Sequence, residues 1–172
     1  DEQHRRLHVL ATKEHPTRQL SRFLRPRKAE SGIIYCSSRK RTEQLAETLK
    51  KDGFDALPYH AGLDQGTRMR NQDRFLQEDG VVMTATIAFG MGINKPDVRF
   101  VCHADMPNNV EGYYQEIGRA GRDGAPAETL TLFGPDDIRL RRGQIDEGLA
   151  PPERKAADHA RLNALLGLAE SP

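Results

Sequence analysis

Residues 32–51 read GIIYCSSRKRTEQLAETLKK, and this stretch predicts the architecture of the chain. It begins with a short continuous apolar run, which is typical of a parallel strand buried on both faces of a sheet. Ser37 or Ser38 then offers the side-chain oxygen that caps a helix start. Apolar residues recur at helical spacing from about Arg39 to Lys51, and Gly53 marks the expected stop. The stretch therefore predicts one βα unit.

The same alternation of strand and helix extends in both directions along the chain. Further strands are expected at residues 7–11, 56–59, 81–84, 100–103 and 129–133. The alternation predicts an α/β fold, a three-layer sandwich with a mostly parallel central sheet covered by helices on both faces. In such sheets, ligands bind beyond the carboxyl ends of the strands, and most of the motif blocks described below are expected to converge on that rim.

Details of these elements carry further expectations. The first helix should start at Pro16, with Leu20 on its inner face. Asp64 should cap a helix that runs to about Asp79, with Met69, Phe75 and Leu76 on its inner face. Pro58 weakens the strand at 56–59 because proline lacks an N–H. The alternation at 129–133 suggests an edge strand.

The pattern changes after Phe133. Pro135 starts a helix, the pair at 151–152 breaks the chain, and residues 162–169 form a closing amphipathic helix. Since no strand accompanies these helices, we expect a domain over residues 1–134 and a C-terminal helical extension over residues 135–172.

Composition narrows the class of protein. The chain has 172 residues, of which 37% are hydrophobic and 30% charged, as suits one globular domain with a core. The net charge of +1 does not itself indicate a nucleic-acid partner, although Lys and Arg cluster at 18–28, 39–41 and 139–142. Apolar stretches are too short to cross a membrane and the start lacks a signal peptide, so we expect an intracellular protein. This means cytoplasm or nucleoid in a bacterium and nucleus in a eukaryote.

The cysteines indicate a reducing compartment. Cys36 and Cys102 lie far apart in sequence at the ends of apolar runs, with no Cys-x-x-Cys spacing. Buried free thiols are predicted rather than a disulfide or a metal site, and no zinc is expected in this chain.

Residues 113–124 read YYQEIGRAGRDG, the end of a helix followed by a glycine-spaced loop with two arginines. Asn108 and Glu111 form a capping pair at the start of that helix. Arg119 and Arg122 are three residues apart, so one turn could project both toward one anion, and a planar guanidinium suits a triphosphate. The alternative is a helix C-terminus with solvated arginines.

The motifs that hold a triphosphate do not occur in this sequence. There is no Gly-x-x-x-x-Gly-Lys-Ser/Thr segment, and no apolar strand ends in Asp-Glu to hold magnesium. The chain is therefore not expected to hydrolyse ATP alone.

Four blocks together resemble the RecQ family of DNA helicases. They are residues 113–124 and, earlier in the chain, GIIYCSSR at 32–39, YHAGL at 59–63 and ATIAFGMGINKP at 85–96. The resemblance runs from about Leu7 to the end and identifies the chain as the second RecA-like lobe of such a helicase. It implies that ATP and Mg²⁺ are held mainly by a first lobe, in the cleft between the lobes.

The resemblance also implies roles for individual residues. Arg122 would be the arginine finger that neutralises charge on the transferred phosphoryl group, and Arg119 would make a second contact or couple the sites. Gln115, Asn94 and Gly92 would belong to the nucleotide side of the cleft.

The implied partners are single-stranded and duplex DNA, together with the first lobe of the same polypeptide. Unwinding would run 3′ to 5′. RecQ proteins usually carry Asn where this chain has Ser37, which departs from the family pattern. The residues implied to contact the DNA backbone are Ser37, Ser38, Arg39, His60, Gly62, Thr84 and Thr86.

Two other readings remain open. A DEAD-box RNA helicase lobe would have the same fold, but it typically shows His-Arg-x-Gly-Arg where this chain has Tyr-Gln-Glu-Ile-Gly-Arg. A catalytically silent module that only binds nucleic acid or a partner protein is the other.

Overall fold

The computed structural model describes residues 6–12, 15–86, 95–105, 119–133 and 135–170. The elements in chain order are β1 (Arg6–Thr12), α1 (Pro16–Leu24), the 3₁₀ turn η2 (Arg25–Arg27), β2 (Gly32–Cys36), α2 (Arg39–Lys51), β3 (Asp55–Tyr59), α3 (Gln65–Gln77), β4 (Val81–Thr86), β5 (Phe100–His103), β6 (Ala127–Phe133), α5 (Pro135–Glu147) and α6 (Pro152–Glu170). The expected helix at 108–117 lies outside the described residues.

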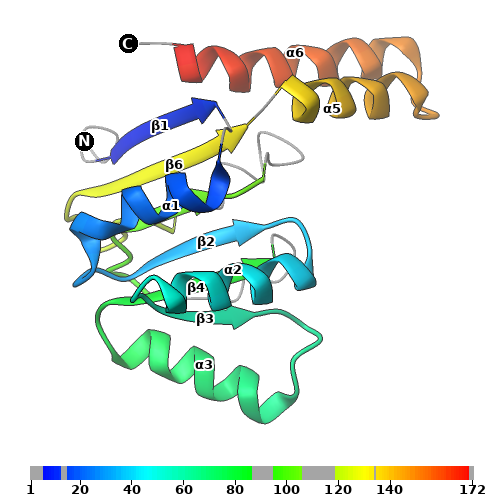
Figure 1. The fold of residues 1–172 in the computed structure, drawn as a ribbon. Helices are drawn as coiled ribbons and strands as arrows, with labels where there is room; N and C mark the ends of the chain where they lie inside the picture. Colours follow the sequence, from blue (N-terminus) through cyan, green and yellow to red (C-terminus); the bar gives the residue numbers. More distant parts are fainter. Residues whose placement is uncertain (1–5, 13–14, 87–94, 106–118, 134, 171–172) are drawn as a thin grey trace.

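The described strands form one sheet, which Figure 1 shows from β1 at one edge to β3 at the other. Its six strands run in the order β1-β6-β5-β2-β4-β3, and every neighbouring pair is parallel. The parallel α/β fold predicted from the sequence is therefore confirmed. Because all strands point the same way, their carboxyl ends share one edge of the sheet.

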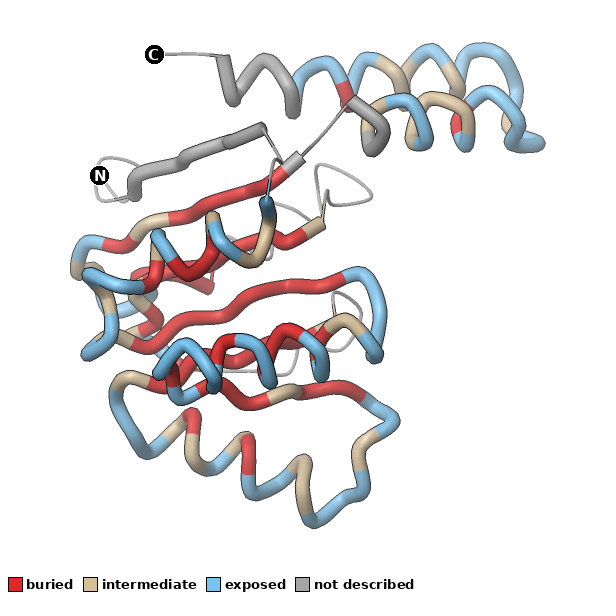
Figure 2. Tube along the Cα trace, in the orientation of Figure 1, coloured by how far each residue is buried: buried red, intermediate tan, exposed pale blue. Residues whose placement is uncertain are grey.

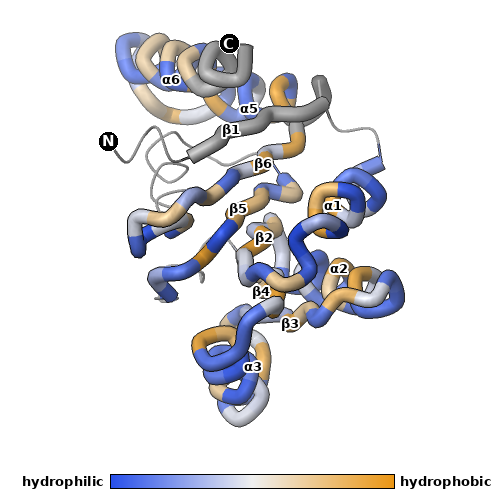
Figure 3. The backbone as a smooth tube through the Cα atoms, turned by 90° about the vertical axis from the view of Figure 1, so that its left-hand side faces the viewer, coloured by the Kyte–Doolittle hydropathy of each residue, from blue (hydrophilic) through white to orange (hydrophobic). Residues whose placement is uncertain are grey.

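Helices cover the sheet on two sides, as Figure 3 shows in a view turned by 90°. Leu20 and Leu24 of α1 and Leu45 and Leu49 of α2 pack on one face. Phe75 of α3 packs on the other, beside β3 and β4. Figure 2 shows the buried residues concentrated in the strands between these layers. The result is the three-layer sandwich expected from the alternating pattern.

The start of β2 shows how closely the first layer packs. A Cβ added to Gly32 would lie 2.1 Å from the Phe100 ring, so this position accepts only glycine without rearrangement. The Phe100 ring in turn meets Phe23 of α1 edge-to-face, with 5.9 Å between centroids. Gly32 thus lets the aromatic side chain of β5 lie directly over β2.

Local signals set the ends of α2 and α3. The Ser38 hydroxyl accepts a hydrogen bond from the Arg41 N–H at 3.1 Å, and α2 has the predicted bounds. Asp64 accepts the Thr67 N–H at 2.9 Å, which begins α3. The helix ends at Gln77 rather than near 79. The prediction that Met69 faces inward is wrong, because its side chain is 54% exposed.

The strand order at the two edges of the sheet differs from the prediction for residues 129–133 and agrees with the prediction for Pro58. Residues 129–133 were expected at an edge, but β6 lies between β1 and β5. Its threonines, Thr129 and Thr131, are therefore fully buried. β3 is an edge strand, which suits Pro58 because a prolyl nitrogen cannot donate to a further neighbour.

α5 and α6 form the expected helical extension, which lies at the β1 edge of the sheet. Arg142 of α5 contacts the His159 ring at 3.2 Å and Asn163 at 2.5 Å on α6. His159 also bonds Asp146 at 2.7 Å. These polar contacts join the two helices. Among the described residues, none of the helices is long and apolar enough to cross a membrane.

Candidate functional site

The carboxyl ends of β2, β3 and β4 form a polar edge, which we call the carboxyl rim. Ser37, Ser38 and Arg39 follow β2 and are all exposed. The Ser37 N–H donates to the Asp105 carboxylate beyond β5 at 2.8 Å, which ties two strand ends together. Because Ser38 caps α2, the positive end of that helix faces the rim. The side chains after β2 therefore lie where an anionic backbone could reach them.

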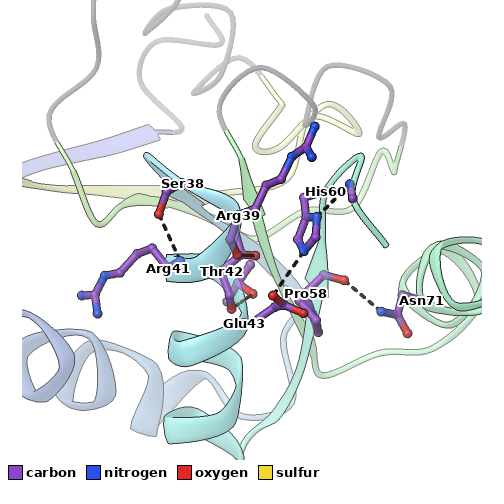
Figure 4. A network of polar contacts seen from close by, with 10 residues as sticks. Ser38, Arg39, Arg41, Thr42, Glu43, Pro58, His60 and Asn71 are labelled. Carbon is purple, nitrogen blue, oxygen red and sulfur yellow. Dashed lines mark hydrogen bonds and ion pairs between the residues drawn. The ribbon is translucent and has the colours of Figure 1, made fainter. Parts of the chain in front are cut away.

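Arg39 lies beside the segment that follows β3 (Figure 4). Its guanidinium nitrogen would be 3.1 Å from a Cβ at Gly62, so the glycine leaves room for the arginine. His60 is buried and its Nδ1 accepts the Gly62 N–H at 3.0 Å. The other ring nitrogen, Nε2, lies 3.7 Å from the Glu43 carboxylate. This geometry gives His60 a structural task, holding the backbone at Gly62.

Thr84 and Thr86 differ in exposure although both belong to β4. Thr84 is fully buried, and its hydroxyl donates to the Thr42 carbonyl of α2 at 2.8 Å. This geometry counts against the predicted contact between the Thr84 side chain and DNA, because the hydroxyl is used to join β4 to α2. Thr86 ends the strand half-buried and keeps its place on the rim. Gly92 and Asn94 lie outside the described residues.

The arginine loop, residues 119–124, lies at the other end of the strands. The Gly121 N–H donates to the Val98 carbonyl at 2.8 Å, and the Asp123 N–H donates to the Pro96 carbonyl at 2.9 Å. Both acceptors precede β5, so the loop sits at the amino end of that strand. The motif blocks were expected to converge on the carboxyl rim, but the arginine loop lies at the opposite end of β5. Roughly 10–15 Å of strand separates it from the carboxyl rim.

The two arginines of the loop lie in different surroundings. Arg119 is buried with 9% of its surface exposed, whereas Arg122 is exposed. Gly121 between them has a φ of +65°, and a Cβ there would lie 2.9 Å from the Ala125 carbonyl oxygen. The glycine is therefore required by the turn, as the sequence suggested. Gln115 lies outside the described residues.

The arginine loop has charged neighbours that the sequence analysis did not identify. Arg99 bonds the Asp123 carboxylate at 2.5 Å, and this hydrogen bond holds the pKa of Asp123 below its ordinary value. Lys95 is buried and lies 3.3 Å from the Asp97 carboxylate. Arg99 and Asp123 are 24 residues apart, so no local pattern links them. Only the pairing of the two segments could have shown them to be neighbours.

The cysteines are buried free thiols, as predicted. Burial raises the pKa of the Cys36 thiol to about 12, and it also raises the pKa of Cys102. Neither is therefore a nucleophile at neutral pH. Within the described part of the chain, no group of three or more His, Cys, Asp or Glu side chains is arranged to hold a metal ion.

A RecA-like lobe with an arginine loop and a polar carboxyl rim is the class that this fold and site define. The model of the helicase conserved C-terminal domain family matches residues 15–124, so the chain belongs to that family. Its relatives make it a RecQ-type lobe. It is 45% identical over 164 residues to the ATP-dependent DNA helicase RecQ of Haemophilus influenzae, covering 95% of this chain and 26% of that protein.

Another relative agrees with this assignment, and a solved structure has the same fold. The ATP-dependent DNA helicase RecQ of Bacillus subtilis is 43% identical over 89% of this chain and 26% of its own length. The chain thus spans about a quarter of the curated relatives it matches. The Escherichia coli DEAD-box protein SrmB, solved with the regulator RraA, aligns with a TM-score of 0.67 at 28% identity, covering 85% of this chain and 86% of that one.

A further structure is similar in fold alone. Domain 2 of the DEAD-box helicase Mss116p, solved on an RNA duplex, aligns with a TM-score of 0.66 at 19% identity. It covers 88% of this chain and 66% of that one.

Proposed function

We propose that this chain is the second motor lobe of an ATP-dependent DNA helicase that unwinds in the 3′ to 5′ direction. The observation that carries the proposal is the division of the site. An exposed arginine, Arg122, lies on a loop that is held by backbone hydrogen bonds at one end of β5. The carboxyl rim, with the exposed residue Arg39, lies at the opposite ends of the strands, after β2, β3 and β4. One lobe can in this way face a nucleotide and a nucleic-acid backbone at the same time.

At the nucleotide side, Arg122 is proposed as the arginine finger. ATP with Mg²⁺, held mainly by a first lobe, supplies the phosphoryl group that is transferred. Arg122 is an exposed residue, and its guanidinium fits that group because it stays charged at any working pH and offers two parallel donors to phosphate oxygens. Buried Arg119 supports the loop or makes a second contact. Gln115, Asn94 and Gly92 complete the proposed nucleotide wall.

At the DNA side, the exposed side chains of Ser37, Ser38 and Arg39 are proposed to contact phosphates. The Gly62 backbone and the Thr86 side chain continue this track across β3 and β4. These contacts are to the backbone, so binding should depend strongly on salt and weakly on sequence. His60 contributes through Gly62, whose N–H it accepts.

The test of the finger is Arg122→Ala in the helicase that carries both lobes. If Arg122 meets charge that develops only in the transition state, ATP affinity should stay within about twofold while DNA-stimulated turnover falls by on the order of 10³ or more. Arg122→Lys should restore little, because a flexible ammonium lacks the planar fork. Steady-state ATPase and nucleotide binding are measured on the same samples.

Arg22→Ala is the matched control, since Arg22 is an exposed arginine on α1 away from the loop. It should leave both turnover and affinity unchanged. Normal turnover in a folded Arg122→Ala protein would refute the finger.

An RNA helicase lobe is the second candidate, because the two solved structures described above are DEAD-box proteins and one was solved on an RNA duplex. The identity to those proteins is 28% and 19%, against 45% to a relative named as a DNA helicase. We therefore favour DNA. Stimulation of ATPase by single-stranded RNA at concentrations where DNA has no effect would reverse this preference.

A further inference from the structure

The backbone on either side of Arg122 is fixed to one neighbouring segment, residues 95–99. Gly121 donates to Val98 at 2.8 Å and Asp123 donates to Pro96 at 2.9 Å, so both flanking amides are bonded. Gly124 then donates back to Gly121 at 3.0 Å and closes the turn. Arg122 therefore projects from a backbone whose position depends on the segment before β5.

Arg99 makes three hydrogen bonds, one of which joins this segment to the arginine loop. Its Nε donates to the Asp97 carbonyl at 3.1 Å, Nη1 donates to the Pro126 carbonyl at 3.1 Å, and Nη2 donates to the Asp123 carboxylate at 2.5 Å. The side chain is only 17% exposed. One guanidinium thus bonds Asp123 in the arginine loop, Pro126 just after the loop, and Asp97 in its own segment.

Asp123 is the partner that makes this connection specific to the loop. The same carboxylate oxygen that receives Arg99 also accepts the Ala125 N–H at 3.0 Å. Asp123 follows Arg122 directly in the chain. A change at Arg99 therefore reaches the backbone of Arg122 through a single residue.

We infer that Arg99 is a positioning residue for Arg122: it holds the arginine loop in the geometry in which the finger meets the nucleotide. The inference rests on the proposed function of Arg122. It gives a role to Arg99, which has no role in the proposed function. A misplacement of about 1 Å at a catalytic group can lower turnover by about 10². The backbone bonds from Gly121 and Asp123 remain when Arg99 is replaced. Within the described residues, however, no other hydrogen bond joins the Asp123 carboxylate to the segment before β5, so the loop can shift on that side.

The experiment replaces Arg99 by Met in the helicase that carries both lobes. DNA-stimulated kcat should fall by between about tenfold and about 10², while the Kd for ATP stays within about twofold. Arg99→Lys should resemble Arg99→Met, because one ammonium on a flexible stem cannot span three acceptors that need a planar fork.

Arg74→Met is the matched control. Arg74, like Arg99, is a partly exposed arginine that bonds an acidic side chain distant in sequence. It lies 2.5 Å from Asp55 and 3.0 Å from Glu78, beside β3 at the far edge of the sheet. It should lower the melting temperature without lowering kcat. A kcat loss of equal size in Arg74→Met would overturn the inference, because general destabilisation would then explain both results.

A double variant separates this inference from the proposal on which it rests. In an Arg122→Ala background, Arg99→Met should change kcat by less than about twofold, since the residue acts only through the finger. If Arg122→Ala alone has no effect, the proposed function fails. If Arg122→Ala is impaired but Arg99→Met retains normal kcat, or lowers kcat equally in both backgrounds, the positioning role fails.

Asp123→Ala keeps the test decisive if Arg99→Met does not fold. It removes the oxygen that receives Arg99, whereas the amide oxygen of an Asp123→Asn protein could still accept from both Arg99 and Ala125. The same kcat loss with unchanged ATP affinity is expected, and an unaffected kcat would overturn the inference.

Discussion

His60 offers a direct test of how the carboxyl rim works, because its two ring nitrogens have different neighbours. Nδ1 accepts the Gly62 N–H at 3.0 Å, whereas Nε2 faces Glu43 at 3.7 Å. Asparagine places an acceptor near the position of Nδ1, and glutamine places its polar group near the position of Nε2. If His60 serves by holding Gly62, His60→Asn should bind single-stranded DNA within about twofold of the unaltered protein and His60→Gln should not.

The magnitude follows from the surroundings of the hydrogen bond. Gly62 is exposed, so water replaces the lost acceptor and the free energy of unfolding should fall by only about 0.5–1.5 kcal/mol. The larger effect is local. If the Gly62 backbone and the adjacent Arg39 lose one phosphate contact, the slope of log K against log salt should become shallower by about 0.7.

The assay is a DNA titration at several salt concentrations, beside a melting curve for each variant. Glu43→Gln is the control, because Glu43 is 56% exposed and its removal leaves the bond to Gly62 in place. It should bind as the unaltered protein does. The reverse order, with His60→Gln normal and His60→Asn weakened, would show that Nε2 itself contacts DNA and would refute this reasoning.

Two further predictions concern stability. Gly32→Ala should lower the free energy of unfolding by about 1–3 kcal/mol, because the new Cβ lies 2.1 Å from the Phe100 ring, and urea unfolding measures it; an unchanged midpoint would contradict the close packing. Arg74 holds the pKa of Glu78 below its ordinary value of 4.5 through a hydrogen bond, so the stabilisation is present above about pH 5 and is lost as the pH falls through the lowered pKa. In Arg74→Met the free energy of unfolding should therefore fall less steeply as the pH is lowered. Unfolding measured between about pH 3 and pH 6 tests this, and an equal slope in both proteins would contradict it.

The parts of the fold that depend on neighbours in sequence could be predicted closely. The bounds of α2 were correct because Ser38 caps its start and Gly53, with a φ of +93°, follows its end. Both signals lie within the helix or next to it. The same reasoning found the start of α3 at Asp64.

Strand order could not be predicted in the same way, because it is set by pairings between distant segments. The alternation of Thr129 and Thr131 suggested an edge strand, yet β6 lies between β1 and β5 and both threonines are fully buried. Met69 failed for a related reason, since a helix on the edge strand β3 has little sheet to cover.

For the site, the sequence supplied the residues but not their grouping. The rim after β2 and β3 followed from strand ends alone. The place of the arginine loop did not, because it depends on hydrogen bonds to Val98 and Pro96. The burial of Thr84 likewise depends on an acceptor 42 residues away. Such contacts leave no mark in a short window of sequence.

The pairing of β1 with β6 also has a consequence for synthesis on the ribosome. Arg6 is in register with Ala127, so β1 lacks the strand with which it pairs in this sheet until β6 has been made. At 5–20 residues per second, the delay is on the order of 10 s. During that interval β2 to β5 can assemble with α1 and α2, while β1 has already been made but lacks the strand with which it pairs. The sheet then closes late, when the arrival of β6 gives both β5 and β1 their missing neighbour.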